Sequence, residues 1–180
     1  MTHKFIIIAA MGNRREIGIN KPNHFDLPGW HLPNDTKRFT KMIKGKVIIV
    51  GSNTFEAILG QTEDHKPYKD CITVVLTKTN RIVKFKNTYY THNFVDAAKL
   101  ATKESAGKNI YILGGTQIYK HFIKTADELD ITFVDGIFKN ANVLFPKFNL
   151  KDWELIKQSK KYISKNHSHK YFYAKFKRKK

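Results

Sequence analysis

Short runs of β-branched apolar residues alternate along the chain with segments whose apolar residues recur at helical spacing. This alternation of strand and helix is typical of an α/β fold with a parallel sheet. Toward the C-terminus, apolar and polar side chains alternate around a turn at Lys165-Asn166, which predicts an antiparallel hairpin of residues 153–164 and 167–177 at the sheet edge. The other predicted strands cover residues 4–11, 46–51, 72–77, 87–91, 109–113 and 128–134, and the predicted helices cover residues 34–44, 52–59, 94–105 and 117–125.

Capping residues and glycines suggest where the helices begin and end. Asn34 is placed to cap the first helix and Gly45 to end it, while Ser52 is placed to cap the second. The residues of the third helix expected to face inward are Val95, Ala98, Leu100 and Ala101. We therefore expect one α/β domain over residues 1–180, with a mixed, mostly parallel sheet, helices on both faces, and a basic tail at about residues 175–180.

The composition is that of a basic domain able to build one core. At 180 residues, a chain buries roughly 70% of the surface that it exposes when unfolded. The single cysteine, Cys71, cannot form an internal disulfide, and the N-terminal sequence lacks the features of a secretory signal. No apolar run approaches the roughly 20 residues needed to cross a bilayer. We expect a cytoplasmic monomer that does not bind membranes.

The formal net charge of +18 favours non-specific attraction to nucleic acid. The basic excess is concentrated after Glu154. Five aromatic residues are interleaved with the lysines there: Tyr162, Tyr171, Phe172, Tyr173 and Phe176. Because these aromatics alternate with polar residues, we interpret them as one buried face of closing strands and the lysines as the solvated face. Nucleic acid is expected to bind only non-specifically, if at all.

Glycines follow several predicted strands, at the ends where open α/β sheets bind ligands. Gly51 is followed by a Ser-Asn-Thr segment at the start of one helix, and Gly114-Gly115 by Thr116 at the start of another. Backbone N–H groups at two such helix starts can receive phosphate groups. Neither site matches the GxGxxG or P-loop pattern, and each alone is more typical of a tight turn.

Asp35 is the strongest candidate for a chemical role. It lies at the start of a predicted helix, one turn before Phe39 and close behind Trp30, Leu32 and Pro33. One interpretation is that its charge stabilises the helix dipole. The apolar and aromatic surroundings support another, in which the carboxylate binds a cationic or amidine-like heterocycle through a pair of charge-assisted hydrogen bonds. The residues alone leave both interpretations open.

Several short motifs occur in an order that resembles the dihydrofolate reductase family. The segment from Trp30 to Asp35, followed by Phe39, is similar to the family pattern W-x-L-P-x-D/E…F. The other matching motifs are Ile17-Gly18, Gly51-Ser52-Asn53-Thr54-Phe55, Leu76-Thr77-Lys78, Ile112-Leu113-Gly114-Gly115 with Tyr119, and Phe145-Pro146. Each motif is weak alone, but together they are specific and cover nearly the whole chain.

The resemblance implies an enzyme of tetrahydrofolate biosynthesis and one-carbon metabolism, a target of antifolates, that uses NADPH to reduce 7,8-dihydrofolate. Asp35 would bind the pteridine and promote protonation at N5 while hydride reaches C6, and Trp30 would orient the water that brings the proton. The implied substrate-binding residues are Ile8, Ala9, Asp35, Phe39, Thr54, Ile58, Leu113 and Tyr119. The implied cofactor-binding residues are Ala10, Ile17, Gly18, Gly51, Ser52, Asn53, Thr54, Leu76, Thr77, Lys78, Gly114, Gly115, Thr116, Gln117 and Ile118. Lys78 is the candidate for binding the 2′-phosphate.

Two departures from the family pattern lie on the cofactor side. Residues 17–30 form a longer segment than the family leads us to expect, so the loop over the nicotinamide is expected to move differently. We expect His24, Phe25 and Asp26 to be exposed loop residues there. Ser52 replaces the basic residue that is common after this glycine, so we expect some use of NADH.

Two further departures lie on the substrate side. Residues 60–72 lack the arginine that holds the α-carboxylate of the substrate's glutamate, and Lys66 or Lys69 offers only a point charge in its place. Val143 stands where a threonine commonly supports the pocket carboxylate. Because a hydrogen bond to the charged group is then missing, we expect a raised pKa for Asp35.

Two other functions stay open at this stage. One is a reductase of the same fold that acts on a tail-less pteridine or on a riboflavin-pathway pyrimidine. The other is a basic nucleic-acid-binding protein, which explains the net charge but not Asp35 or the glycines after the strands. His167 and His169 are spaced as on one face of an exposed strand, and we expect no metal site.

Overall fold

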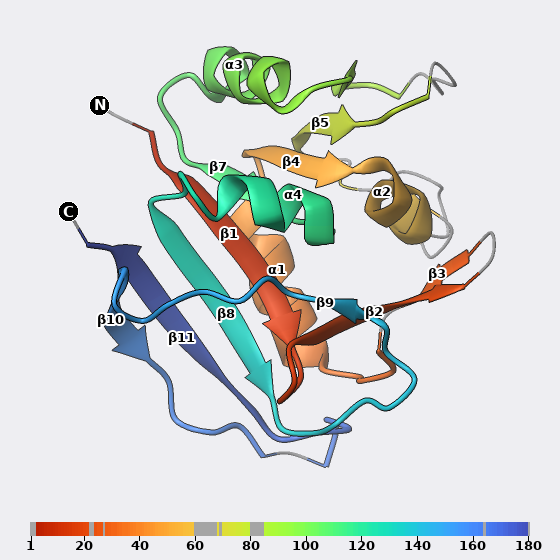
Figure 1. Cartoon of the computed structure of the whole chain (residues 1–180), viewed down its shortest axis with the longest axis vertical. Helices are drawn as coiled ribbons and strands as arrows, with labels where there is room; N and C mark the ends of the chain where they lie inside the picture. Colours follow the sequence, from red (N-terminus) through yellow and green to blue (C-terminus); the bar gives the residue numbers. More distant parts are fainter. Residues whose placement is uncertain are drawn as a thin grey trace.

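A large mixed sheet forms the centre of the computed structural model (Figure 1). The structure describes residues 3–21, 24–26, 28–59, 68, 70–79, 85–163 and 165–179, with only the backbone at 24 and 25. The strands of this sheet are β1 (Phe5–Met11), β4 (Val47–Gly51), β5 (Ile72–Leu76), β6 (Thr88–Thr91), β7 (Ile110–Ile112), β8 (Glu128–Val134), β10 (Trp153–Gln158) and β11 (Tyr171–Arg178). Within the described residues the sheet has eight strands in the order β10-β11-β8-β1-β7-β4-β5-β6.

Strand direction divides this sheet into two parts. β1 lies centrally and pairs in parallel with β7 on one side and with β8 on the other. The parallel pairing continues from β7 through β4 and β5 to β6. β11 runs antiparallel to both β8 and β10. The fold class expected from the sequence, a mostly parallel sheet with a C-terminal antiparallel hairpin, is confirmed.

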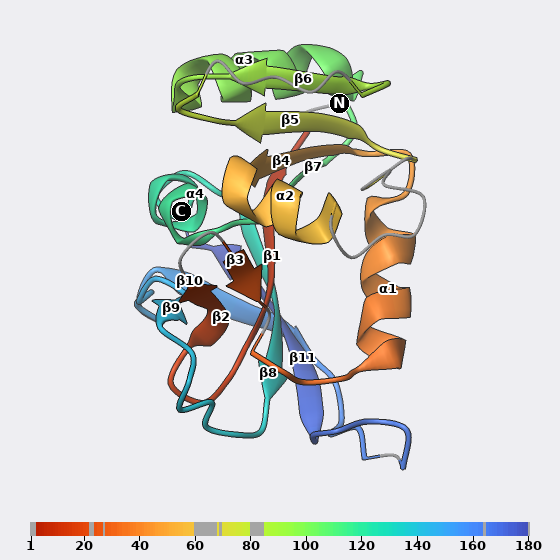
Figure 2. The same cartoon turned by 90° about the vertical axis from the view of Figure 1, so that its right-hand side faces the viewer.

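Helices cover both faces of the sheet, and Figure 2 shows α1 and α4 on opposite sides of it. Ile6 and Ile8 of β1 pack in the core formed with α1 and α2, whereas Ile7 and Ala9 pack in the core formed with α3 and α4. Successive side chains of a strand point to opposite faces, so β1 contributes to both cores. The helices of the described chain are α1 (Pro33–Ile43), α2 (Ser52–Leu59), α3 (Phe94–Ser105) and α4 (Thr116–Phe122). None of them has the length and apolar character of a membrane span.

Two of the expected helix caps are wrong. α1 begins at Pro33 after the N-cap residue Leu32, so Asn34 lies inside the first turn and does not cap the helix. Proline suits the first helical position because the missing N–H would have no partner within the helix there. Ser52 lies within α2 as its first residue.

α3 has the predicted bounds, and one of its four expected inward positions is wrong. Asn93 caps the helix, and its side chain accepts a hydrogen bond of 2.8 Å from the backbone N–H of Asp96. Val95 is 59% exposed, so its expected inward position is wrong, whereas Ala97 is completely buried. Ala98 and Leu100 pack against the core and Ala101 is completely buried, so these three expected inward positions are confirmed.

The C-terminal hairpin departs from its prediction in two respects. Its strands are shorter, and among the described residues near the turn Tyr162 is joined to Tyr171 by an isolated bridge. The aromatic side chains do not share one buried face: Tyr171 and Tyr173 pack with Tyr162, whereas Phe172 and Phe176 pack in the core of the other face. β11 lies between β8 and β10, so both of its edges are paired, and its side chains pack in clusters on both faces of the sheet.

The segment over the sheet edge is partly a hairpin instead of a loop. β2 (Glu16–Lys21), β3 (His24–Asp26) and β9 (Val143–Leu144) form a second sheet, three-stranded within the described residues, in the order β3-β2-β9. The carboxylate of Asp26 pairs with the Lys21 ammonium over 2.9 Å and is partly buried. The expectation of an exposed loop is therefore wrong for the backbone and for Asp26, while the side chains of His24 and Phe25 lie outside the described residues.

Candidate active site

A cleft of about 550 Å³ opens where three parallel strands end. Its walls come from the end of β4 with the start of α2, from the end of β5, and from the start of α4, which follows β7. This is the place where ligands bind in open α/β sheets. The lining residues are Asn20, Gly51, Ser52, Asn53, Thr54, Leu76, Thr77, Lys78, Thr79, His92, Phe94, Gly115, Thr116, Gln117, Ile118 and Val143. Most of the residues expected to contact a cofactor are among them.

Glycines keep the backbone of this cleft uncovered at two points. A Cβ atom on Gly51 would lie 3.2 Å from the Ile118 side chain, and one on Gly115 would lie 3.2 Å from Thr54 Oγ1. The Gly51 N–H donates a 2.7 Å hydrogen bond to the Gly114 carbonyl, which joins the ends of β4 and β7. Gly114 has a φ of +99°, and a cis peptide bond links it to Gly115. Phosphate groups can approach such a backbone closely, because no side chain intervenes.

Some of the residues predicted to bind the cofactor do not line the cleft. Ala10 packs in an apolar cluster away from it, and Ile17 packs against the main core. Gly18 pairs in register with Val143, which does line the cleft, so Gly18 lies at its edge. Gly114 lies behind the lining, where its carbonyl is bonded to β4.

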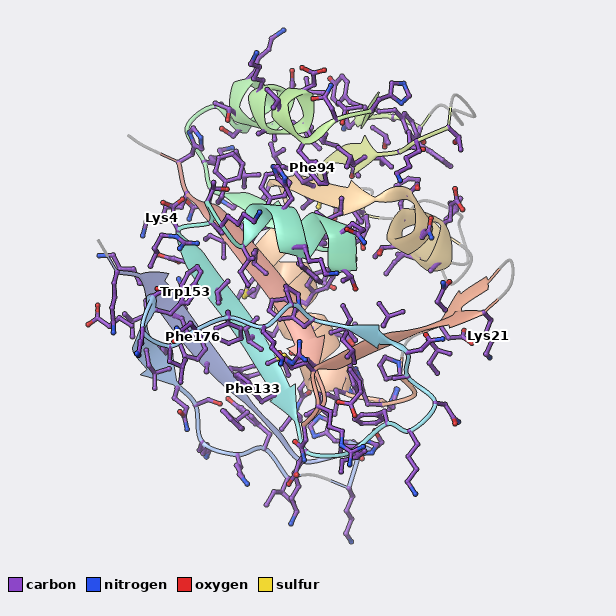
Figure 3. All side chains as sticks on the ribbon, viewed as in Figure 1. Lys4, Lys21, Phe94, Phe133, Trp153 and Phe176 are labelled. Carbon is purple, nitrogen blue, oxygen red and sulfur yellow. The ribbon has the colours of Figure 1, made fainter. Side chains whose placement is uncertain are left out.

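Other residues line the cleft without having been predicted: Asn20, Thr79, His92, Phe94 and Val143. His92 Nδ1 lies 3.1 Å from the Thr77 carbonyl oxygen, which ties the end of β6 to the end of β5. Phe94 stacks on His121 of α4 with ring centroids 3.8 Å apart, between α3 and α4 (Figure 3). Because β6 ends just before His92, the rule that ligands bind at the carboxyl ends of strands identifies His92 and Phe94 in retrospect.

Asp35 lies in the first turn of α1 and faces β8. The buried Thr132 hydroxyl donates a 2.8 Å hydrogen bond to Asp35 Oδ1. Burial raises the pKa of Asp35, the hydrogen bond from Thr132 and the charge of Arg38 oppose that rise, and the charge of Asp130 adds to it. The expected direction of the pKa shift is correct, but its cause is burial. The expectation of a missing hydroxyl is wrong, because the supporting threonine is Thr132 and Val143 lies in β9 beside the cleft.

The apolar residues expected around a pteridine divide between the two faces of the sheet. Ile8, Phe39 and Leu113 pack in one cluster beneath α1. Ala9 faces the opposite core, so its side chain does not join them. The buried Tyr119 hydroxyl donates a 2.8 Å hydrogen bond to the Ile8 carbonyl, and burial raises the pKa of that phenol. Tyr119 therefore connects α4 with the middle of β1.

The remaining predicted residues lie beside the cleft or beside the apolar cluster near Asp35. Trp30 is half-buried and meets the Phe138 ring edge-on, with centroids 4.9 Å apart. Ile58 is half-buried in the last turn of α2, and Thr54, one turn earlier, lines the cleft. The structure thus places Thr54 in the cleft.

β2, which borders the cleft at Asn20, is hydrogen-bonded to the segment before β9. The Asn20 N–H donates to Asn142 Oδ1 over 2.7 Å, and Asn142 Nδ2 donates back to the Asn20 carbonyl over 2.9 Å. Nearby, the buried carboxylate of Glu16 accepts hydrogen bonds from the N–H groups of Arg14 and Phe138, at 2.7 and 3.1 Å. These contacts anchor the base of β2.

Comparison with known proteins agrees with this geometry. The family model described as dihydrofolate reductase matches residues 4–178. The chain belongs to the dihydrofolate reductase family. A dihydrofolate reductase from Staphylococcus aureus is 30% identical over 149 residues, which span 83% of this chain and 82% of that protein. One from Haloferax volcanii is 25% identical over 150 residues, 83% of this chain and 74% of that protein.

The fold of a solved dihydrofolate reductase is also similar. The structure from Enterococcus faecalis, complexed with NADP(H) and RAB-propyl, gives a TM-score of 0.82 at 24% identity and covers 98% of this chain and 97% of that chain. As a member of the dihydrofolate reductase family, this chain is an oxidoreductase that reduces dihydrofolate with NADPH. The resemblance found in the motifs is confirmed, and the pyrimidine-reducing and nucleic-acid-binding alternatives are not favoured.

Proposed function

We propose that the chain converts 7,8-dihydrofolate to 5,6,7,8-tetrahydrofolate with the pteridine ring bound against Asp35. The observation that carries this proposal is a partly buried carboxylate, held by Thr132 over 2.8 Å and followed one helical turn later by Phe39. Phe39 belongs to the apolar cluster that includes Ile8 and Leu113. A flat heterocycle with an amino group beside a ring N–H suits such a site, because the carboxylate accepts two hydrogen bonds while apolar side chains cover the ring.

The cleft beside this pocket suits a dinucleotide. Its lining is mostly glycine, hydroxyl and amide residues, with Lys78 and His92 as the basic side chains among the described lining residues. The uncovered backbone at Gly51 and Gly115 would bind the pyrophosphate, and Lys78, which is exposed, would pair with the 2′-phosphate. When bound, NADPH supplies the hydride that the pteridine C6 accepts.

Asp35 would act on the proton that the reduction requires. Its negative charge, placed beside the pteridine, increases the proton affinity of N5, and the proton reaches N5 from water. Because burial raises the pKa of Asp35, its carboxylate is a stronger hydrogen-bond acceptor than a solvated aspartate. Trp30 would wall this side of the pocket and orient the water, since it is partly buried two residues before Leu32 at the entrance to α1.

Recognition of the substrate's glutamate requires a cationic group beside the pteridine pocket. Lys66 and Lys69, which we considered as replacements for the missing arginine, lie outside the described residues. Tyr68, between them in the sequence, meets the Phe39 ring edge-on with centroids 6.5 Å apart, so Tyr68 adjoins the proposed pteridine pocket. A tail-less pteridine is accordingly the competitor that the experiment must include.

The test follows the loss of NADPH absorbance with dihydrofolate and, in parallel, with a tail-less dihydropteridine. Wild type is compared with Asp35→Asn and with the control Asp70→Asn, which changes a half-exposed aspartate near Lys44. We expect dihydrofolate turnover to fall by about 10²- to 10⁴-fold in Asp35→Asn, the range typical of lost acid–base catalysis, and to be unchanged in Asp70→Asn. Full activity in Asp35→Asn would refute the assignment, and turnover of only the tail-less ring would replace dihydrofolate as the substrate.

We further propose that the enzyme acts as a cytoplasmic monomer and binds nucleic acid only non-specifically. The cleft and the Asp35 pocket are both formed by one chain, so catalysis needs no second copy. Light scattering should give the mass of one chain. Binding of an oligonucleotide should weaken steeply with salt and show no sequence preference, as expected for attraction by net charge alone. A dimer mass or sequence-dependent binding would contradict these proposals.

A further inference from the structure

Two charged side chains lie directly behind Asp35, between α1 and β8. Arg38 follows Asp35 by three residues and shares its helix face. Asp130 precedes Thr132 by two residues and shares its face of β8. The Arg38 guanidinium pairs with the Asp130 carboxylate. This ion pair lies next to the hydrogen bond from Thr132 to Asp35 between the same helix and strand. Two adjacent cross-links therefore join helix and sheet, and one of them is ionic.

The ionic cross-link is well enclosed. The side chain of Asp130 is 10% exposed and that of Arg38 is 26% exposed. The Arg38 guanidinium also lies over the Tyr173 ring, 4.0 Å from its centroid, and Tyr173 stands opposite Thr132 in the register of β11. Burying an ion pair costs desolvation that a well-packed apolar pair avoids, so stability alone does not account for one at this position.

We propose that Arg38 and Asp130 form a positioning pair for Asp35, in which Asp130 keeps the arginine out of the substrate pocket and Arg38 balances the carboxylate charges. This inference rests on the proposed role of Asp35. Without Asp130, the acidic group nearest to Arg38 on its own helix face is Asp35, and pairing would occupy the oxygens needed for the pteridine. Without Arg38, the buried Asp130 carboxylate would oppose ionisation of Asp35 as an uncompensated like charge.

The next acidic residue along β8 already has its own partners. The Glu128 carboxylate is bound by Lys4 over 2.6 Å and by Lys175 over 2.7 Å, and Figure 3 shows Lys4 at the start of β1. Burial raises the pKa of Glu128, but the two lysines outweigh it and hold the pKa below its usual value. The charge of Glu128 is thus compensated by the two lysines, and the ion-pair partner of Arg38 is Asp130.

The other titratable groups facing this region are tyrosines. The charge of Asp35 acts on Tyr171 and Tyr173 of β11, and the charge of Asp130 acts on Tyr111 of β7. Burial raises the pKa of all three phenols, so they stay neutral at physiological pH. The charge near Asp35 is therefore governed by Arg38 and Asp130.

The test measures the ionisation of Asp35 directly. Aspartate is labelled with ¹³C at the carboxyl carbon, and the Asp35 signal is assigned by its loss in Asp35→Asn and followed by NMR from acid to neutral pH. Arg38→Gln should raise the pKa of Asp35, Asp130→Asn should lower it, and the double variant should return it toward the wild-type value. A variant that only loosens packing does not produce opposite shifts that cancel.

Kinetics supply the second measurement. In Asp130→Asn the KM for dihydrofolate should rise about fivefold to tenfold with a smaller change in kcat, because the freed arginine competes for one charge-assisted hydrogen bond. Arg38→Lys, which keeps the charge but not the planar guanidinium, should retain a pKa close to wild type. Lys41→Gln removes the same charge from the exposed face of α1 and should change neither the pKa of Asp35 nor the KM.

The outcomes separate this inference from the function on which it rests. Shifts of the Asp35 pKa in the same direction in both single variants, or no shift in either, would overturn the positioning pair. Turnover that survives Asp35→Asn would instead defeat the proposed catalytic role, and the titration would still decide the pair because it needs no turnover. If Arg38→Gln does not fold, Asp130→Asn still tests the predicted direction of the pKa shift, and a pKa unlike that of wild type in Arg38→Lys would contradict the role of the charge.

Discussion

The two sides of β1 form their halves of the site in different ways. Toward β7, β4 and β5, the cleft is built from backbone and small neutral side chains, with glycines at Gly51 and Gly115 where the chain must stay uncovered. Toward β8 and β11, the pocket depends on side chains that cross from helix to sheet, namely Asp35 with Thr132 and Arg38 with Asp130. The cleft depends on the path of the main chain, and the Asp35 pocket depends on charged side chains held in position by their partners.

This difference implies opposite sensitivities to mutation. A site made of backbone should tolerate loss of a side chain but not the addition of one at a glycine. A site made of buried charged groups should respond to the loss of a single hydroxyl, because an unpaired buried acceptor costs more than the average hydrogen bond contributes. Four predictions test this contrast, from the largest expected effect to the smallest.

Gly114→Ala should cause the largest loss. The alanine Cβ would lie 2.7 Å from the Tyr119 ring and would be held at a φ of +99°. The conformation costs roughly 1–2 kcal/mol and the overpacking about 1–3 kcal/mol. The control is Gly45→Ala, at a φ of +67° with nothing within 4 Å of the added atom. Urea denaturation of both variants should show the larger loss of unfolding free energy at residue 114, and equal losses would mean that Tyr119 moves aside.

Thr132→Val should leave the fold intact and weaken catalysis. The substitution keeps the side-chain shape but removes the 2.8 Å hydrogen bond to Asp35. Losing one bond to a charged group costs about 1.5–3 kcal/mol, or roughly 10- to 100-fold in kcat/KM for dihydrofolate. The pKa of Asp35 should rise further, because that hydrogen bond opposes the effect of burial. Thr132→Ser, which restores the hydroxyl, should recover most of the loss; if it does not, the methyl group matters more than the bond.

Asp35→Asn should stabilise the folded chain at neutral pH although it impairs catalysis. Because burial raises the folded-state pKa of Asp35, the folded state binds that proton more tightly than the unfolded state, and stability is lost as pH rises toward the folded-state value. Asparagine carries no charge and keeps an acceptor for the Thr132 hydroxyl. The Tm of the variant should exceed that of wild type at pH 7, and the gap should shrink as the pH falls toward about 4, the ordinary aspartate pKa. A gap that is independent of pH would exclude this cause.

The cleft half was largely predictable from the sequence, because its signals are local. Each glycine follows its own apolar strand, and parallel strands bring their carboxyl ends to one edge of the sheet. Gly51, Thr77 and Gly115 could therefore be placed together without knowing the sheet order. The residues missed there, such as Asn20 and Val143, come from the second sheet, whose short strands form only by pairing with each other.

In the Asp35 half, Asp35 and the apolar residues Ile8, Phe39 and Leu113 were predictable, but the polar groups that support Asp35 were not. Its supporting hydroxyl lies 97 residues away in the sequence, and motif order pointed to residue 143, whereas the strand register places Thr132 there. Asp130 interrupts an apolar strand pattern, but nothing local shows that Arg38 will face it. Pairing between a helix and a distant strand is a tertiary property, and a single sequence carries no direct signal of it.

Lys78→Ala should have the smallest effect, which makes it the sharpest test of the contrast. Lys78 is exposed at the rim of the cleft, where water and salt screen its charge, and exposed ion pairs contribute about 0.2–1 kcal/mol. The kcat/KM for NADPH should therefore fall by no more than about fivefold, with NADH unchanged, and the difference should disappear at high salt. Lys99→Ala, an exposed lysine of α3, serves as the control. Unchanged preference between the cofactors would remove Lys78 from recognition of the 2′-phosphate. A loss larger than that of Thr132→Val would mean that the cleft also depends on placed charge, and the contrast between the two halves would fail.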